Sequence, residues 1–567
     1  MSRKILEKHR RRYAAESGEN TPGPGPVRIA LIYPNGYSQA MANLGYQTVY
    51  HLFNASSDCC CERFFLPDKE DLVEYEKNRF PLVSLETGTP LAEFDLIALS
   101  ISFENDYLNL PKIFELGHIP LFSAQRGAHD PLVLFGGVCA FLNPEPLAEI
   151  ADLVAVGEAE VILPVLIPAL LTYLGHESTA LGVFEQLPGI YLPAQVAVGY
   201  LGDGTLAKIS APGVLRQYLA DLDTSASRSF ILNEEAEFGS MALTEVMRGC
   251  SRGCRFCAAG YVYLPPRERS LENLIPQVEA GLCHRSRIGL VGAAVADHAD
   301  ISALQQEIML HGGEVSVSSL RLDALTSAEA RQLQAAGLKT VAIAPEAGSQ
   351  QMRDLINKNL DEAQILHAVH LLADAGMLNL KLYFLIGLPG EEDSDIDAIL
   401  ALADQVRLIW REAGRKRGSL GNLTLSVNPF IPKPFTPFQW AGMETEKGLK
   451  QKLRKLHVGV SKLPNTELIS ESIRSSQLQA LFARGDRRIG RLLPEIAAGG
   501  NLGQILRRNG LQLDFYVTRE RGEFEIFPWE VIDQGNQRSY LWQEYQKGLS
   551  GKATPRCFDG CRRCGIC

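Results

Sequence analysis

The stretch "ALTEVMRGCSRGCRFCAAGY" (residues 242–261) joins an apolar, strand-like run to a loop that carries three cysteines. Cys250, Cys254 and Cys257 stand at the spacing C-x3-C-x2-C. Helix-length and apolar segments alternate after this loop, as they do in successive βα units. The run from residue 242 is therefore predicted to be the first strand of a β/α barrel. Its cysteines then lie at the carboxyl ends of the strands, where barrel enzymes hold their active sites.

Six apolar runs predict six parallel strands between residues 241 and 455. Six βα units are fewer than the eight of a complete barrel, so we expect a partial (β/α)6 TIM-type barrel. The predicted strands are residues 242–249, 287–294, 314–321, 339–348, 379–390 and 422–432.

Residues 27–205 precede this barrel and have the pattern of a doubly wound α/β domain. Short apolar runs at 28–33, 95–102, 131–137 and 151–160 are typical of buried parallel strands. We therefore expect an α/β protein with a Rossmann-like N-terminal domain. Residues 1–26 are basic and expected to be flexible, residues 206–240 form a connector, and residues 456–567 form a C-terminal region.

Composition narrows the class of protein. The formal net charge of −10 argues against a protein coated in nucleic acid, although the basic segments 447–457 and 484–491 would suit a polyanionic partner if they are not simply solvated. The apolar run 161–175 contains two prolines and favours a buried helix over a membrane span. No secretory signal is recognised, so we expect a cytoplasmic protein. Among its twelve cysteines, those that cluster are expected to bind metal rather than form disulfides.

The number of cysteines distinguishes two sites. Three thiolates on a cubane iron–sulfur cluster leave one iron open to a ligand, whereas four thiolates close the site. The first motif has three, and its position favours a cluster over zinc, which the spacing alone also permits. The chain ends with four, at C-x3-C-x2-C-x2-C, which would hold either a second [4Fe-4S] cluster or a structural zinc: Cys557, Cys561, Cys564 and Cys567.

Other cysteines have simpler interpretations. Neighbouring side chains of a strand point to opposite faces, so "CCC" at residues 59–61 cannot direct three thiols at one metal and is expected to pack. Cys283 falls in a predicted helix and is also expected to be a packing residue.

The octet "CSRGCRFC" resembles the signature of the radical SAM superfamily, with Phe256 as the aromatic residue before the last cysteine. The resemblance implies that the open iron of a [4Fe-4S] cluster chelates S-adenosylmethionine (SAM). One electron then cleaves the sulfonium and produces a 5′-deoxyadenosyl radical. A low-potential donor resembling flavodoxin or ferredoxin would supply that electron.

The same resemblance implies where SAM is bound. "VGAAVADH" (291–298) replaces a family Gly-Gly-Glu, so backbone carbonyls or Asp297 would receive the methionine amine. Ser318 and Arg321 correspond to the segment that contacts ribose and carboxylate, and Glu346 to the acid of the next motif. "YFLIGLPGE" (383–391) resembles the strand that contacts adenine.

The N-terminal domain resembles the cobalamin-binding domain fused to many radical SAM enzymes. It departs from that family because the Asp-x-His-x-x-Gly loop, which supplies a histidine to cobalt, is absent. His51, His118 and His129 stand in other contexts. Cobalamin would bind without a protein histidine, or the domain has lost it.

These features lead to one functional hypothesis and two alternatives. The first is a radical SAM, cobalamin-dependent methyltransferase acting on an unactivated carbon. The second is a cobalamin-independent radical SAM enzyme that modifies RNA or protein. The third is a non-catalytic iron–sulfur electron-transfer or sensor protein, which the signature disfavours because electron carriers need no open iron. The substrate and the oligomeric state are not indicated by the sequence.

Overall fold

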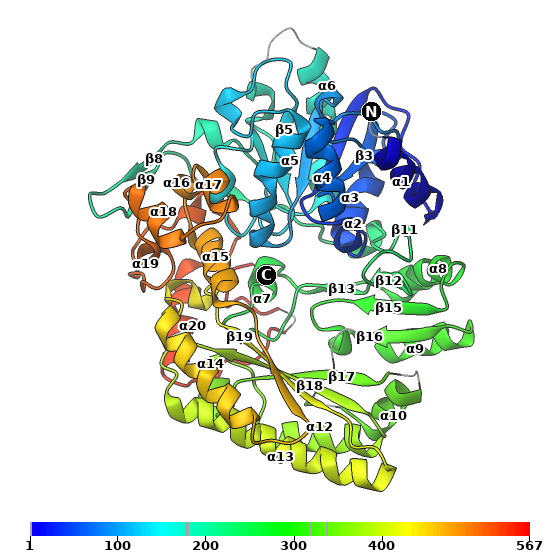
Figure 1. The fold of residues 1–567 in the computed structure, drawn as a ribbon, viewed down its shortest axis with the longest axis vertical. Helices are drawn as coiled ribbons and strands as arrows, with labels where there is room; N and C mark the ends of the chain where they lie inside the picture. Colours follow the sequence, from blue (N-terminus) through cyan, green and yellow to red (C-terminus); the bar gives the residue numbers. More distant parts are fainter. Residues whose placement is uncertain are drawn as a thin grey trace.

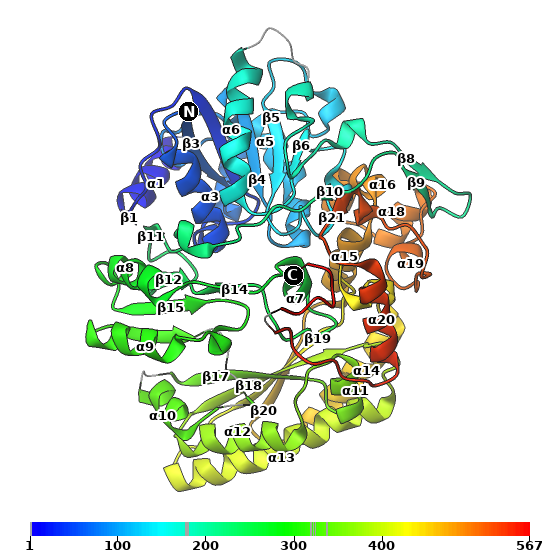
Figure 2. The ribbon, with the colours of Figure 1, turned by 180° about the vertical axis from the view of Figure 1, so that it is seen from behind.

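The computed structural model describes residues 3–175, 181–317, 320, 322–323, 325–335, 338–558 and 560–566. An N-terminal α/β domain lies above a barrel that is divided into two sheets (Figure 1). The C-terminal helices lie beside both, and the end of the chain returns to the middle of the molecule (Figures 1 and 2).

The N-terminal domain contains a six-stranded sheet in the order β3-β2-β4-β5-β6-β7, parallel except for β7. This confirms the predicted Rossmann-like architecture. Its strands are β2 (Val27–Tyr33), β3 (Cys59–Phe65), β4 (Leu96–Ser100), β5 (Leu132–Gly136), β6 (Leu153–Ala155) and β7 (Ile190–Tyr191). Cys59 and Cys61 are buried on one face of β3 while Cys60 is half-buried, as expected for packing residues.

Helices cover both faces of this sheet because its strands are apolar on both sides. The helices of the domain are α1 (Arg3–Ala14), α2 (Tyr37–Met41), α3 (Leu44–Ala55), α4 (Lys69–Asn78), α5 (Leu110–Gly117) and α6 (Ala159–Gly175). Helices α3 and α6 pack with Ile29 and Leu31 in one core, and α5 packs with Ala30 and Ile32 in the other. Helix α6 is the apolar run predicted to be buried. No helix in the described ranges is both long and apolar enough to span a bilayer.

The basic N-terminus differs from the flexible segment that we expected. It forms α1, in which Ile5 is 1% exposed and packs into the core. Its basic side chains find acidic partners, with Lys8 at 2.5 Å from Asp71 and Arg12 at 2.6 Å from Glu235. The packing of Ile5 and these ion pairs therefore hold the segment against the domain, although its composition predicted a flexible terminus.

The barrel strands form two parallel sheets, β12-β15-β16 and β17-β18-β19-β20. All six predicted strands are present, and β20 adds a seventh beyond the predicted barrel. Their bounds are β12 (Ala242–Glu245), β15 (Arg287–Val291), β16 (Glu314–Val317), β17 (Thr340–Glu346), β18 (Asn379–Ile386), β19 (Leu423–Pro429) and β20 (Thr466–Ile469). The helices between them are α8 (Leu271–Leu282), α9 (Ile301–Leu310), α10 (Ser327–Ala335), α11 (Gln350–Leu355), α12 (Glu362–Asp374), α13 (Asp393–Arg417) and α14 (Glu446–Val460).

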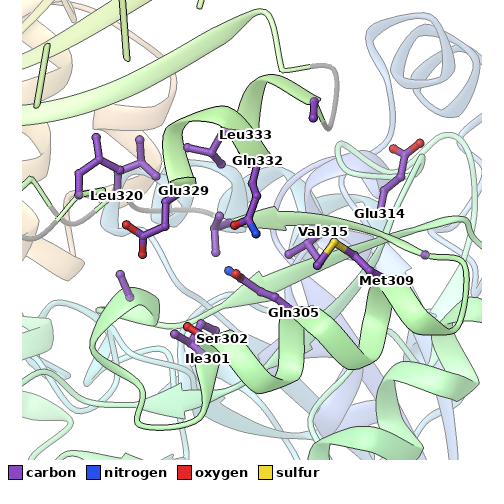
Figure 3. Close-up of a pocket in the computed structure, with 15 residues that line it drawn as sticks. Ile301, Ser302, Gln305, Met309, Glu314, Val315, Leu320, Glu329, Gln332 and Leu333 are labelled. Carbon is purple, nitrogen blue, oxygen red and sulfur yellow. The ribbon is translucent and has the colours of Figure 1, made fainter. Parts of the chain in front are cut away.

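A cavity of about 290 Å³ lies where the two halves of the barrel meet (Figure 3). Residues of α9, β16 and α10 line it, and its walls are mainly apolar. Gln305, Glu329 and Gln332 bring polar groups to it. The cavity therefore lies away from the strand ends that carry the cysteines.

The C-terminal region connects the domain to the barrel. Its helices are α15 (Ile473–Arg484), α16 (Arg487–Gly490), α17 (Leu493–Ala497), α18 (Leu502–Arg508), α19 (Leu513–Tyr516) and α20 (Arg538–Leu549). Strand β10 (Val214–Leu215) of the connector pairs with β21 (Ile532–Asp533) of this region. Residues 550–566, called the tail below, run on from α20 and return to α7 (Ala259–Val262) (Figure 2).

The two basic segments are largely used for contacts within the chain. In 484–491, Arg487 pairs with Glu145, and Arg491 with Glu149. In 447–457, three lysines also pair with carboxylates, and Lys452 lies 2.7 Å from Glu391. These pairs weaken the case for a polyanionic partner at either segment.

Candidate functional site

The three cysteines of the first motif lie on the loop between β13 (Met247–Arg248) and α7. Strand β13 pairs with β14 (Arg267–Glu268), so both ends of the segment that contains the loop are fixed. Gly249 begins the loop with a φ of +84°, and a Cβ there would stand 2.5 Å from the carbonyl oxygen of Tyr263. A residue without a side chain is therefore needed for the turn into the motif.

The thiols of this loop lie close enough to influence one another electrostatically. Burial raises the pKa of Cys254 to about 12, with further increases from Cys257 and Cys250 and a decrease from Lys358. Burial is also the main cause of the raised pKa of Cys257, ahead of the charge of Cys250. Three partly buried thiols on one loop are the soft donor set that an iron–sulfur cluster or zinc requires, and a metal would deprotonate them.

The metal ligands themselves stay a prediction. Within the described ranges, no three His, Cys, Asp or Glu side chains already stand in the arrangement of a metal site. The assignment rests on the spacing of Cys250, Cys254 and Cys257, on their shared loop and on their proximity. Phe256 is half-buried and packs against the main core, as an anchor for the loop.

Glu346 and Lys358 form a charged pair beside these thiols. Glu346 ends β17 with a φ of +67°, after a bulge that begins at Ile343, and its Oε1 is 3.1 Å from Lys358 Nζ. Burial lowers the pKa of Lys358, but Glu346 and the nearby Cys254 outweigh this and raise it. The sequence predicted Glu346 at this place and gave no signal for Lys358.

Asp297 is held by an arginine from the cysteine loop. Arg252 donates two hydrogen bonds to it, at 2.7 and 2.8 Å, and lies 3.5 Å from Asp323. Arg556 of the tail reaches the same Asp323 at 2.6 Å. Two arginines and two carboxylates therefore alternate in one cluster of ion pairs. Neither Arg252 nor Arg556 was identified from the sequence.

A cavity of about 160 Å³ opens between this group and the end of β17. Asp297, Arg252 and Asp323 line it together with Lys358 and the backbone after β15. The segment "VGAAVADH" therefore borders a polar cavity next to the cysteine loop, where the resemblance expects SAM. Ser318, Arg321 and Cys567, which were also predicted as site residues, lie outside the described residues.

The tail brings the second cysteine motif against the first. Cys557, Cys561 and Cys564 line a small cavity together with Cys250. The pKa of Cys561 is lowered, because hydrogen bonds from Arg563 and Cys557 outweigh the effect of burial. The sequence predicted two separate sites and could not show that they adjoin.

The carboxyl edge of the N-terminal sheet is where a corrin would be expected. Glu104, after β4, accepts hydrogen bonds from Lys433 and Gln479. Asn143, after β5, donates to Gly485, and Glu158, after β6, pairs with two arginines of the barrel. The polar side chains of three successive loops are thus bonded to the barrel and the C-terminal region.

The three histidines considered for cobalt lie elsewhere. His51 stacks on Phe230 with ring centroids 4.0 Å apart and pairs with Glu19. His118 ends α5 and His129 precedes β5, so both lie toward the opposite edge of the sheet. The positions of these histidines do not suit a ligand to cobalt. The polar side chains of the three loops are also already hydrogen-bonded, so the residues present do not fit a corrin that is bound through a protein ligand.

Comparison with known proteins identifies the family. Residues 45–193 match the family described as radical SAM proteins, N-terminal, and residues 244–403 match the radical SAM superfamily. The chain is a radical SAM protein. The second match begins within β12 and includes the cysteine loop, Asp297 and Glu346, so the resemblance read from the motif is confirmed.

Relatives of this radical SAM protein include an uncharacterized protein of Methanocaldococcus jannaschii, 29% identical over 494 residues, which cover 87% of this chain and 96% of the relative. A tRNA-2-methylthio-N(6)-dimethylallyladenosine synthase of Coxiella burnetii is 23% identical over 195 residues, 29% of this chain and 41% of that one. Among solved structures, the cobalamin-dependent SAM radical enzyme OxsB gives a TM-score of 0.47 at 14% identity, over 93% of this chain and 79% of that chain. Coproporphyrinogen III oxidase of Escherichia coli gives 0.28 at 13%, over 48% and 80%.

Proposed function

We propose that this radical SAM protein reductively cleaves SAM at a [4Fe-4S] cluster held by Cys250, Cys254 and Cys257. The products are methionine and a 5′-deoxyadenosyl radical, which abstracts hydrogen from the substrate. The observation that carries the proposal is the set of three neighbouring thiols on the loop after the first barrel strand, inside the matched domain. When bound, the cluster supplies one electron to the sulfonium and leaves one iron open.

The cavity beside the loop supports the binding of a zwitterionic ligand. Asp297 is the acceptor we assign to the ammonium group of SAM, and Arg252, now paired with it, is the donor we assign to the carboxylate. Lys358 stays protonated beside Glu346 and places a positive charge near the thiols. A positive charge there offsets the negative charge of three thiolates.

Anaerobic reconstitution with iron and sulfide, followed by dithionite and SAM, tests this function. We expect 5′-deoxyadenosine and methionine in equal amounts, measured by liquid chromatography with mass detection. Protein treated identically without iron serves as the control. An iron-loaded chain that leaves SAM intact would contradict the proposal.

Methyl transfer through cobalamin is a more specific hypothesis about what the radical enzyme does. It is supported by the resemblance of the N-terminal domain and by a Rossmann-like sheet next to the barrel. The bonded loops and the position of the histidines favour the alternative, in which the radical modifies its substrate without cobalamin.

Spectra of protein from cells grown with hydroxocobalamin separate the two forms. We expect no corrin band in the purified chain, because Glu104, Asn143 and Glu158 already use the edge of the sheet. Stoichiometric corrin would reverse this choice and establish the cobalamin-dependent form.

A further inference from the structure

We propose that Arg556 of the tail is a positioning residue for SAM, which neutralises Asp323 and so leaves Arg252 to hold the carboxylate of SAM. The SAM site is thereby completed by a segment that lies outside the matched radical SAM domain, residues 244–403. The inference rests on the proposed function, because it adds a residue to the roles assigned there to Arg252 and Asp297.

The first observation is the order of the charges beside the polar cavity. Arg252 donates to Asp297 at 2.7 and 2.8 Å and lies 3.5 Å from Asp323. Arg556 donates to Asp323 at 2.6 Å and lies 3.8 Å from Asp297. Both carboxylates and Arg252 line the cavity of about 160 Å³. Each arginine therefore lies within reach of both carboxylates, and a change in one pair affects the other.

The binding of SAM requires an exchange of partners in this cluster. The roles assigned to Asp297 and Arg252 require their mutual pair to open. Arg252 then has a second carboxylate 3.5 Å away, that of Asp323, which competes with the carboxylate of SAM. Arg556 weakens this competition, because a carboxylate that is already paired with one guanidinium attracts another less strongly.

The second observation is that the main chain around Arg556 is fixed against the cysteine loop. The N–H of Cys557 donates to the carbonyl of Ser251 at 2.8 Å, so this bond joins the residues that adjoin the two arginines. The carbonyl of Arg556 itself accepts from Arg563 at 2.7 Å. Arg252 and Arg556 therefore enter the cluster from neighbouring segments that a main-chain hydrogen bond holds together.

The third observation is that other side chains anchor the tail. Asn357 donates to the carbonyls of Gly253 and Thr554, both at 3.1 Å, and accepts from the N–H of Thr554 at 2.8 Å. Arg255 is fully buried and donates to the carbonyl of Lys552 at 2.6 Å. The tail is therefore held against the cysteine loop by contacts that do not involve the side chain of Arg556, and this side chain can be removed while the anchors stay.

The experiment measures the binding of SAM to the reconstituted full chain before reduction, when no electron is present to cleave it. Equilibrium dialysis with radiolabelled SAM gives the dissociation constant. We expect Arg556→Ala to raise this constant about tenfold, the scale of one charge-assisted hydrogen bond. Arg562→Ala removes an exposed arginine of the same tail and is the matched control, with the dissociation constant of the wild type. Unchanged binding by Arg556→Ala would overturn the inference.

The double variant Arg556→Ala, Asp323→Asn separates positioning from a purely structural role. Asparagine at position 323 carries no charge that competes for Arg252, so the double variant should recover most of the affinity that Arg556→Ala loses. A residue that only anchored the tail would not be replaced in this way, because the second change removes the other half of the same ion pair. A double variant that binds SAM no better than Arg556→Ala would therefore refute the positioning role.

Hydrogen exchange gives a second readout that does not depend on catalysis. If Arg556 favours the binding of SAM, SAM must favour the docked tail by the same factor. Exchange in peptides that cover Cys557 should slow about tenfold when SAM is added to the wild type, and should not slow in Arg556→Ala. Equal slowing in both proteins would count against the inference.

The iron content and the wild type distinguish the remaining outcomes. Arg556→Ala should keep the iron content of the wild type, and a loss of iron would overturn the inference because the change would then act on the cysteine loop itself. Failure of the proposed function would differ, since the wild type would then bind no SAM or would leave it intact after reduction with dithionite.

Discussion

Replacing Cys254 with alanine is expected to lower 5′-deoxyadenosine formation by more than about a hundredfold, because outer-shell changes alone weaken metal sites by up to that factor. Cys254 is the middle ligand of the predicted set and the thiol whose pKa burial raises to about 12. This thiol must lose its proton to bind iron. Its loss should remove the catalytic cluster.

Two measurements check this expectation and separate it from misfolding. The iron content should fall by about four per chain relative to the wild type. Cys283→Ala is the matched control. Cys283, which we expected to be a packing residue, is instead an exposed thiol directly after α8, and its replacement should leave deoxyadenosine formation unchanged. Full SAM cleavage by Cys254→Ala would refute the site assignment.

Glu158→Ala should lower the free energy of unfolding by about 3 kcal/mol, the scale for breaking a buried ion pair. The carboxylate of Glu158 accepts from Arg248 at 2.7 Å and from Arg267 at 2.8 Å, where the N-terminal domain meets the barrel. Alanine would leave the guanidinium of Arg267 buried at this junction without its ion pair. Urea denaturation followed by fluorescence measures the difference. Glu412→Ala, in an exposed pair on α13, should change it by less than about 0.5 kcal/mol.

The carboxylate of Glu158 is also expected to make the stability of the protein depend on pH. Burial raises the pKa of Glu158, but Arg267 and Arg248 outweigh it, and the net shift is downward from 4.5. A lowered folded-state pKa stabilises the protein above the unfolded value, and this stabilisation is lost as the pH falls through the folded value. Wild-type stability should therefore fall more steeply below pH 4.5 than that of Glu158→Ala. Equal slopes would show that Glu158 does not carry this effect.

The fold and the grouping of three cysteines on one loop could be predicted because both depend on local pattern. Apolar runs separated by helix-length segments specify parallel strands, and the spacing of Cys250, Cys254 and Cys257 places three thiols on one loop. Glu346 was named for a different reason, because its motif at a strand end resembles one of the family.

The partners of these residues could not be predicted, because they depend on contacts between distant segments. Arg252 and Asp297 are 45 residues apart, and Asn357 and Thr554 are 197 apart. Neither Asn357 nor Arg556 differs in the sequence from an ordinary surface residue. The N-terminus was expected to be flexible because its charge is visible in the sequence, whereas the pocket for Ile5 is formed by the folded domain.

The contact between Arg255 and the tail has a consequence for biosynthesis. The two segments are 297 residues apart, so the tail is synthesised well after the cysteine loop. Domains fold from the N-terminus as the chain emerges, so the barrel is made before the segment that completes the cysteine loop. The cysteine loop is therefore complete only after the tail has been synthesised. A nonsense mutation or a proteolytic cut ahead of residue 552 would leave a barrel that folds but whose cysteine loop lacks its buried partner.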